Sequence, residues 1–155
     1  MVFDSTITVP KMIKGVSEKY PEINAQYKRV NNGEFEPITY RTMFSLALDF
    51  GAALLSLGIK RGDHIGLISD NRAEWQHADI GIMAIGAIDV PRGCDATIVD
   101  LEKILSIAEC KTVIAENNSQ VNKILSIKDK LPFVQRIISF EGESEIKDEV
   151  KKAAK

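Results

Sequence analysis

The segment from Ile38 to Val90 constrains the fold most, because helical and strand patterns alternate along it without a break. Apolar residues first recur at helical spacing. A glycine turn, a short apolar run, a polar turn, a second helical pattern and a second apolar run then follow. Short turns between such patterns are typical of a parallel sheet with helices packed on its faces. The sequence therefore predicts an α/β fold with right-handed crossovers.

The first helix of this segment follows Thr39, whose hydroxyl suits an N-cap. Gly58 is placed to end it in a left-handed conformation. Residues 64–69 form an apolar run that predicts a strand covered on both faces. Asn71, with Glu74 three residues later, predicts a capping box for the second helix. Two apolar helix faces are expected, the first from Met43, Ala47, Phe50, Leu54 and Leu57, and the second from Trp75, Ala78, Ile82 and Ile85.

Three more strands are expected downstream, over residues 87–90, 112–115 and 134–140. Pro91 limits the first of them, since proline lacks a backbone N–H. Intervening helices are expected to begin near Thr97, which with Asp100 forms a capping pattern, and at Ser119. The strands add to the same parallel sheet.

An antiparallel hairpin is predicted before the α/β segment. Residues 24–30 and 35–39 read as its two strands, and Asn31-Asn32-Gly33 between them favours a tight turn. A short helix over residues 9–20 precedes the hairpin. We therefore expect a short antiparallel hairpin to precede the parallel sheet.

Length and charge bound the domain organisation. A chain of 155 residues favours one domain. We predict an N-terminal α/β subdomain over residues 1–140 and a charged C-terminal tail over 141–155, which reads as a truncation point in a linker or surface helix. The chain carries 20 basic and 22 acidic residues, a net charge of -2, which gives no reason to expect a nucleic-acid partner.

Cysteine usage and hydropathy indicate a cytoplasmic protein. Cys94 and Cys110 lie in no metal-binding motif, so we expect two reduced thiols and no metal site. No signal peptide is visible at the N-terminus. No apolar run approaches the roughly 20 residues that cross a bilayer.

Polar residues follow each predicted strand, and ligands of open α/β sheets bind at the carboxyl ends of strands. The candidate ligand or domain-contact loops contain Asp70, Asn71 and Arg72 after the first strand, and Arg92 and Gly93 after the second. Arg72 could meet an anion, but pairing with a local acid is the commoner fate of such an arginine. Arg92 is followed by a glycine that lets the backbone approach a partner closely.

Catalytic motifs are missing from the sequence. It has no G-x-G-x-x-G fingerprint after the first strand, no P-loop and no G-x-S-x-G elbow. His64 and His77 are isolated, and Trp75 belongs to an apolar helix face. We therefore assign no catalytic, cofactor-binding or metal-binding residue.

The ordered short motifs resemble the N-terminal region of the AMP-forming acyl-CoA synthetases, within the adenylate-forming family. The resemblance covers residues 37–140 approximately. The matching pairs are Thr39-Tyr40, Leu57-Gly58, Gly62-Asp63, Asn71-Arg72, Glu74-Trp75, Gly86-Ala87 and Val90-Pro91. Each pair is weak alone, and their order makes the set specific. The PRGCDAT segment after the second strand is similar to the long-chain acyl-CoA and acyl-carrier-protein synthetase branch.

The resemblance implies a fold and a function. The chain would be part of the large N-terminal domain of an ATP-dependent fatty acid–CoA or acyl-carrier-protein ligase. ATP, Mg²⁺ and coenzyme A would serve the full-length enzyme, and its fatty acid substrate leaves peripheral membrane association open. The family's phosphate loop, adenine motif, ribose motif and C-terminal lysine do not occur in this chain, so it is expected to be inactive and to need no cofactor.

The expected partner is the missing catalytic remainder of the same polypeptide, and this interpretation requires the coding sequence to continue past Lys155. Apolar surface meant for that remainder would favour self-association of the isolated chain. One alternative is a self-contained α/β domain that binds a small anion, or regulates, through the Arg72 and Arg92 loops. A stand-alone interaction scaffold has no positive signal in the sequence.

Overall fold

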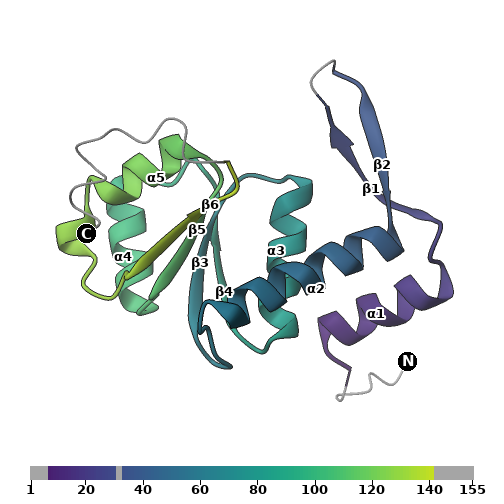
Figure 1. Cartoon of the computed structure of the whole chain (residues 1–155). Helices are drawn as coiled ribbons and strands as arrows, with labels where there is room; N and C mark the ends of the chain where they lie inside the picture. The colour runs from purple at the N-terminus through teal and green to yellow at the C-terminus, as the bar shows by residue number, and fades with distance from the viewer. Residues whose placement is uncertain (1–6, 31–32, 142–155) are drawn as a thin grey trace, which may run out of the picture. The chain divides into compact units, whose positions relative to one another are not determined.

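The computed structural model describes residues 7–30 and 33–141 of the chain. They form two compact units, and each unit is assembled from two separate stretches of sequence (Figure 1). The first unit contains residues up to Arg61 together with Arg72–Ala87. The second contains Gly62–Asn71 and the residues from Ile88 onward.

The first unit consists of three helices and a hairpin. Its elements are α1 (Val9–Lys19), β1 (Asn24–Arg29), β2 (Phe35–Thr39), α2 (Tyr40–Ser56) and α3 (Ala73–Ala84). The two strands pair antiparallel, as predicted, with Arg29 opposite Phe35. Figure 1 shows the hairpin extending away from the three helices. The predicted turn residues Asn31 and Asn32 lie outside the described residues.

The core of the first unit lies between α2 and α3. Met43, Ala47 and Ile80 are buried there, with Ile13 of α1 and Ile38 of β2 packed against them. The two helices approach so closely that a Cβ atom on Gly81 would lie 2.6 Å from the backbone oxygen of Ala47. Backbone contact of this kind fixes the crossing of the helices, because no side chain separates them.

The second unit is a four-stranded parallel sheet with helices. Its elements are β3 (His64–Ile68), β4 (Ile88–Arg92), α4 (Ile98–Ile107), β5 (Thr112–Ala115), α5 (Asn118–Leu125), the 3₁₀-helix η1 (Lys128–Lys130) and β6 (Arg136–Ser139). The strand order is β4-β3-β5-β6. The parallel sheet, its helices and the separate antiparallel hairpin confirm the predicted fold class.

One layer of the second unit's core lies between the sheet and the helices α4 and α5, which Figure 1 shows on the same side of the sheet. Leu101 and Leu105 of α4, and Val121 and Ile124 of α5, are buried in one apolar cluster with strand residues such as Val113. Gly66 leaves room for this packing, since its Cβ atom would lie 2.6 Å from Leu105 Cδ2.

Several predicted element ends are wrong. The N-cap of α3 is Arg72 rather than Asn71, and no side chain caps the helix. Glu74 does not close a capping box, because Arg72 and Lys28 bind its carboxylate. The helix expected from Ser119 is capped by Asn117 and begins at Asn118.

Strand β4 continues through Pro91, which was predicted to limit it. Among the described strands β4 lies at the sheet edge, and a proline is tolerated there because one side of an edge strand needs no donor. The last strand is shorter than predicted and spans Arg136–Ser139. Leu57, expected on a buried face, is 44% exposed. Residues 142–155, most of the predicted tail, lie outside the described residues.

Candidate functional site

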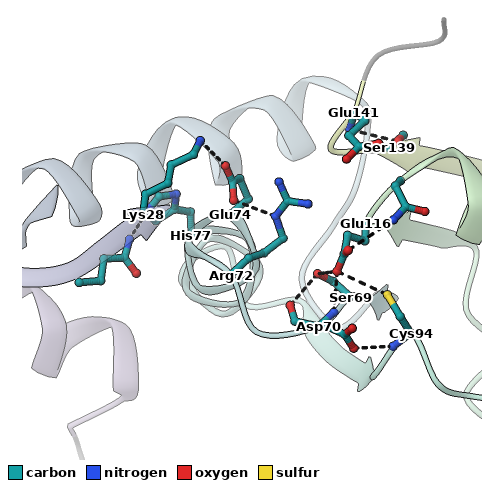
Figure 2. A network of polar contacts seen from close by, with 12 residues as sticks. Lys28, Ser69, Asp70, Arg72, Glu74, His77, Cys94, Glu116, Ser139 and Glu141 are labelled. Atoms are coloured by element: carbon teal, nitrogen blue, oxygen red, sulfur yellow. Dashed lines mark hydrogen bonds and ion pairs between the residues drawn. The ribbon is translucent and has the colours of Figure 1, made fainter. Parts of the chain in front are cut away.

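The five candidate residues divide between the two units. Asp70, Asn71, Arg92 and Gly93 belong to the second unit, and Arg72 belongs to the first. Within the second unit, the residues after β3, β4 and β5 contact one another (Figure 2).

Glu116 is the centre of this contact. Its Oε2 atom accepts hydrogen bonds from Ser69 Oγ at 3.0 Å, from the backbone N–H of Asp70 at 2.8 Å and from the Cys94 thiol at 3.4 Å. Asp70 Oδ1 in turn accepts from the backbone N–H of Cys94 at 2.9 Å. Three loops that are distant in sequence are thus joined through two carboxylates. We call Ser69, Asp70, Cys94 and Glu116 the strand-end network.

A lysine on α5 holds the loop after β4 from another side. Lys123 Nζ donates to the backbone oxygens of Cys94 at 2.9 Å and Ala96 at 3.1 Å. Gln120 Nε2 donates to the same Cys94 oxygen at 3.4 Å. Lys123 is therefore engaged in shaping the loop. Sequence reasoning missed this residue, and its only signal was its place on the helix after β5.

Gly93 is needed for the packing of its own loop. A Cβ atom there would lie 2.7 Å from Asp95 Oδ1 and 3.5 Å from Asp70 Oδ1. The atoms that approach the backbone of Gly93 closely are thus the carboxylates of Asp95 and Asp70 in the same chain. Arg92, at the end of β4, is exposed. Its charge adds to the hydrogen bonds from Thr97 in lowering the pKa of Asp100.

The two cysteines are free thiols, as predicted. Burial, with the hydrogen bond to Glu116, raises the pKa of Cys94 to about 11. Burial, with the charge of Asp89, raises the pKa of Cys110 to about 11. Both thiols are protonated at neutral pH, so neither is an activated nucleophile.

The strand-end network could also be considered as a metal site, because single donor atoms of Asp70, Cys94 and Glu116 lie within 4.8 Å of one another. Mg²⁺ prefers oxygen ligands alone, and a protonated thiol is a poor fit to it. The hydrogen bonds already made by Glu116 explain why these groups are together. We therefore interpret the network as a structural tie between loops.

Arg72 pairs with a local acid, the commoner of its two predicted fates. Its Nε lies 2.9 Å from Glu74 Oε2, and Lys28 of β1 binds the other oxygen of the same carboxylate (Figure 2). Burial raises the pKa of Glu74, but the hydrogen bonds from Arg72 and Lys28 outweigh it and lower that pKa to about 2. The carboxylate holds the hairpin to α3.

Both histidines have structural partners. His77 Nε2 lies 2.6 Å from Gln26 Nε2 of β1, and burial lowers the pKa of His77, which favours the neutral ring that accepts this hydrogen bond. His64 Nδ1 lies 2.6 Å from the backbone oxygen of Ala108. Neither histidine lies in the strand-end network.

Comparison with known proteins identifies the family. The family of AMP-binding enzymes matches residues 15–155. The chain belongs to the AMP-binding enzyme family. A chloroplastic long-chain-fatty-acid–acyl-carrier-protein ligase of Arabidopsis thaliana is 31% identical over 116 residues, which are 75% of this chain and 16% of that enzyme. A long-chain-fatty-acid–CoA ligase of Mycobacterium tuberculosis is 24% identical over 116 residues, or 75% of this chain and 19% of the ligase.

Solved structures of AMP-binding and related enzymes share the fold. An anthranilate CoA ligase in complex with anthranoyl-AMP superposes with a TM-score of 0.80 at 22% identity, over 97% of this chain and 28% of that one. A fatty acyl CoA synthetase of Mycobacterium tuberculosis gives a TM-score of 0.73 at 25% identity, over 84% of this chain and 26% of that one. The chain thus spans less than a third of each of these relatives and structural neighbours.

No helix in the described part of this chain is both long and apolar enough to cross a membrane.

Proposed function

We propose that this chain is the framework segment of an ATP-dependent long-chain fatty acid ligase. The observation that carries the proposal is the family match over residues 15–155, joined to curated relatives whose names are long-chain fatty acid ligases. The chain spans 16% and 19% of the two relatives above, so we propose the remainder of a longer polypeptide as its principal partner.

The proposed reaction of the whole enzyme has two steps. The fatty acid carboxylate attacks the α-phosphate of Mg²⁺-bound ATP, which forms an acyl-adenylate and releases pyrophosphate. A thiol of coenzyme A or of a carrier protein then attacks the acyl carbon, loses its proton and displaces AMP. The first step requires groups that stabilise the developing negative charge.

The strand-end network does not fit that task. Asp70 and Glu116 are carboxylates that would repel a triphosphate, and Lys123 already donates to two backbone oxygens. What these residues do is fix the loops after β3, β4 and β5. This supports a framework role for the chain, and we propose that it has no ligase activity of its own.

The alternative of a self-contained anion-binding domain has less support. Of its two candidate cations, Arg72 is already bound to Glu74. The loops at the carboxyl ends of the strands are joined by the carboxylates of Asp70 and Glu116, which repel an anion. A cytoplasmic location stays a prediction.

The substrate profile of the full-length polypeptide tests this proposal. With ATP, Mg²⁺ and coenzyme A, we expect AMP release with palmitate to exceed that with acetate by roughly a hundred-fold or more in kcat/KM, since each buried methylene contributes about 0.8 kcal/mol. A preference for acetate or an aromatic acid would contradict the long-chain assignment. Absence of adenylation with any acid would contradict the ligase proposal itself.

A further inference from the structure

The hairpin of the first unit packs one of its faces against α3. Side chains alternate between the two faces along a strand, so Gln26 and Lys28 of β1 lie on the same face. Gln26 Nε2 lies 2.6 Å from His77 Nε2, and Lys28 binds the Glu74 carboxylate (Figure 2). The opposite face of the hairpin is exposed, and it consists of Tyr27, Arg29, Phe35 and Pro37.

The hydrogen-bond pattern of the hairpin shows which backbone groups point outward. The N–H of Val30 donates to the oxygen of Glu34, and the residues opposite each other are paired in register from there along both strands. Hydrogen-bonded pairs alternate with pairs whose N–H and C=O groups point away from the partner strand. The backbone groups of Tyr27 and Arg29 in β1, and of Pro37 opposite Tyr27, therefore point outward.

The outer edge of β2 is closed to a further strand, whereas that of β1 is open. Pro37 has no N–H to donate, and proline is one of the devices that protect an edge strand. Tyr27 and Arg29 each have an N–H and a C=O on the outer edge of β1. Among the described residues, no backbone hydrogen bond from outside the hairpin reaches these groups.

The two cations of β1 do not protect this edge. Charged side chains commonly prevent other strands from pairing with an exposed edge. Lys28 is bound to Glu74 on the face that packs against α3. The Arg29 guanidinium lies over the Phe35 ring, 5.5 Å from its centroid, and thus over the hairpin itself. The edge adjoins an exposed aromatic face, on which Tyr27 and Phe35 are each 59% exposed.

We propose that a strand from the remainder of the polypeptide pairs with the outer edge of β1 and extends the hairpin to a three-stranded sheet. This rests on the proposed function, which supplies the remainder. The curated relatives above extend well beyond the region that matches this chain, which is 16% and 19% of their lengths. The added strand hydrogen-bonds to Tyr27 and Arg29, and its side chains extend the aromatic face.

A second copy of the chain is a poorer occupant of this edge. Two β1 edges related by a two-fold axis would pair antiparallel. In the register that pairs Tyr27 of each copy with Arg29 of the other, the two Lys28 residues lie directly opposite each other. Like charges in such positions destabilise a sheet. A strand of different sequence avoids this repulsion.

Amide hydrogen exchange resolved to single residues tests the pairing, by comparison of the full-length polypeptide with the 155-residue chain. The Tyr27 and Arg29 amides should exchange at least about a hundred-fold more slowly in the full-length polypeptide, because only there do they donate to an added strand. Lys28 donates within the hairpin and should be protected in both proteins. Phe35, whose N–H points outward from β2, should exchange rapidly in both.

Three results of this comparison would overturn the proposal. One is equal exchange of the Tyr27 and Arg29 amides in the two proteins. Another is slow exchange in the short chain that depends on protein concentration, since a second copy would then cover the edge. The third is protection of Phe35 instead of Tyr27 and Arg29 in the full-length polypeptide, which would place the added strand on β2.

A substitution in the full-length polypeptide separates the backbone from the side chain. Tyr27→Pro removes one outward N–H and should speed exchange of the Arg29 amide roughly ten-fold, the equivalent of one hydrogen bond. Tyr27→Ala is the matched control, because it removes the same side chain and keeps the N–H, and it should have a smaller effect. Circular dichroism verifies that each variant is folded. Equal effects of the two substitutions would contradict pairing through the backbone.

Ligase activity, measured as AMP release with palmitate on the same full-length preparation, keeps the two proposals apart. Protected Tyr27 and Arg29 amides without activity would contradict the proposed function and leave the added strand standing. Activity without this protection would contradict the added strand and leave the proposed function standing.

Discussion

Each of the two units is stabilised by a different kind of internal contact. In the second unit, a ladder of parallel strands and a layer of leucine, isoleucine and valine side chains carry the packing, and Glu116 joins the loops. In the first unit, α2 and α3 touch through their backbones at Gly81 and Ala47, and Lys28 and Glu74 hold the hairpin to α3.

This difference has consequences for mutation. Where two backbones are in contact, an added methyl group forces the two elements apart. Where a side chain covers a glycine, the side chain can move. The second unit should therefore tolerate small additions better than the first, although its core is more extensively apolar.

The largest expected effect is that of Gly81→Ala in the first unit. The new Cβ atom would lie 2.6 Å from the Ala47 oxygen and 3.1 Å from the Gly51 nitrogen, so α2 and α3 must separate. We expect the free energy of unfolding to fall by about 3 kcal/mol in urea denaturation. Gly15→Ala in α1 is the control, because nothing lies within 4 Å of its Cβ position, and it should stabilise the chain by up to about 1 kcal/mol. Equal effects of the two substitutions would refute the backbone contact.

Gly66→Ala in the second unit should have a smaller effect. Its Cβ atom would lie 2.6 Å from Leu105 Cδ2, the end of a side chain, and 3.4 Å from the methyl groups of Val113. Leu105 can shift, so we expect a loss of about 2 kcal/mol in the same denaturation experiment. If Gly66→Ala were more destabilising than Gly81→Ala, the contrast between the units would be reversed.

Glu74→Gln tests the tie between hairpin and α3. The folded pKa of about 2 lies below the ordinary value of 4.5, so the carboxylate's contribution is complete above about pH 4.5 and is lost as the pH falls towards 2. The groups are partly exposed, and after solvent screening we expect a loss of about 1 kcal/mol at pH 7.

The same substitution should flatten the decline in stability between pH 4.5 and 2. Glu102→Gln removes the exposed pair with Lys130 in the second unit and should change stability little. An unchanged acid profile in Glu74→Gln would show that the hairpin is held by other contacts.

At Cys94 the expected effect is on the reactivity of the thiol rather than on stability. A pKa raised from 9.0 to about 11 leaves about a hundred-fold less thiolate, so alkylation by iodoacetamide at pH 8 should be slower than that of free cysteine by about this factor. Glu116→Gln replaces the carboxylate that helps raise the pKa of Cys94 with a neutral amide, and it should speed the reaction. Cys110→Ser as background isolates the Cys94 signal. Rapid alkylation of Cys94 in the protein that retains Glu116 would contradict the hydrogen bond between Cys94 and Glu116.

The local sequence pattern was sufficient to predict much of the fold. The strands at 35–39 and 112–115 have the predicted ends, because an apolar or alternating run is bounded there by clear turn residues. The capping box of Thr97 with Asp100 is formed as predicted. These features depend on residues that are neighbours in sequence.

Tertiary partners decide the features that sequence reasoning missed. The start of α3 depends on Glu74, whose carboxylate binds Lys28, 46 residues earlier, instead of capping the helix. The Glu116–Cys94 contact requires β3 to lie between β4 and β5, and several strand orders fit the same sequence. Hydrophobic periodicity does not contain this information.

The framework account is tested most directly by ATP–pyrophosphate exchange with palmitate and Mg²⁺, measured on the 155-residue chain and on the full-length polypeptide. Circular dichroism establishes that the short chain is folded. The account predicts exchange by the full-length polypeptide and none above the blank by the short chain. Exchange by the short chain that saturates with both ATP and palmitate would contradict it.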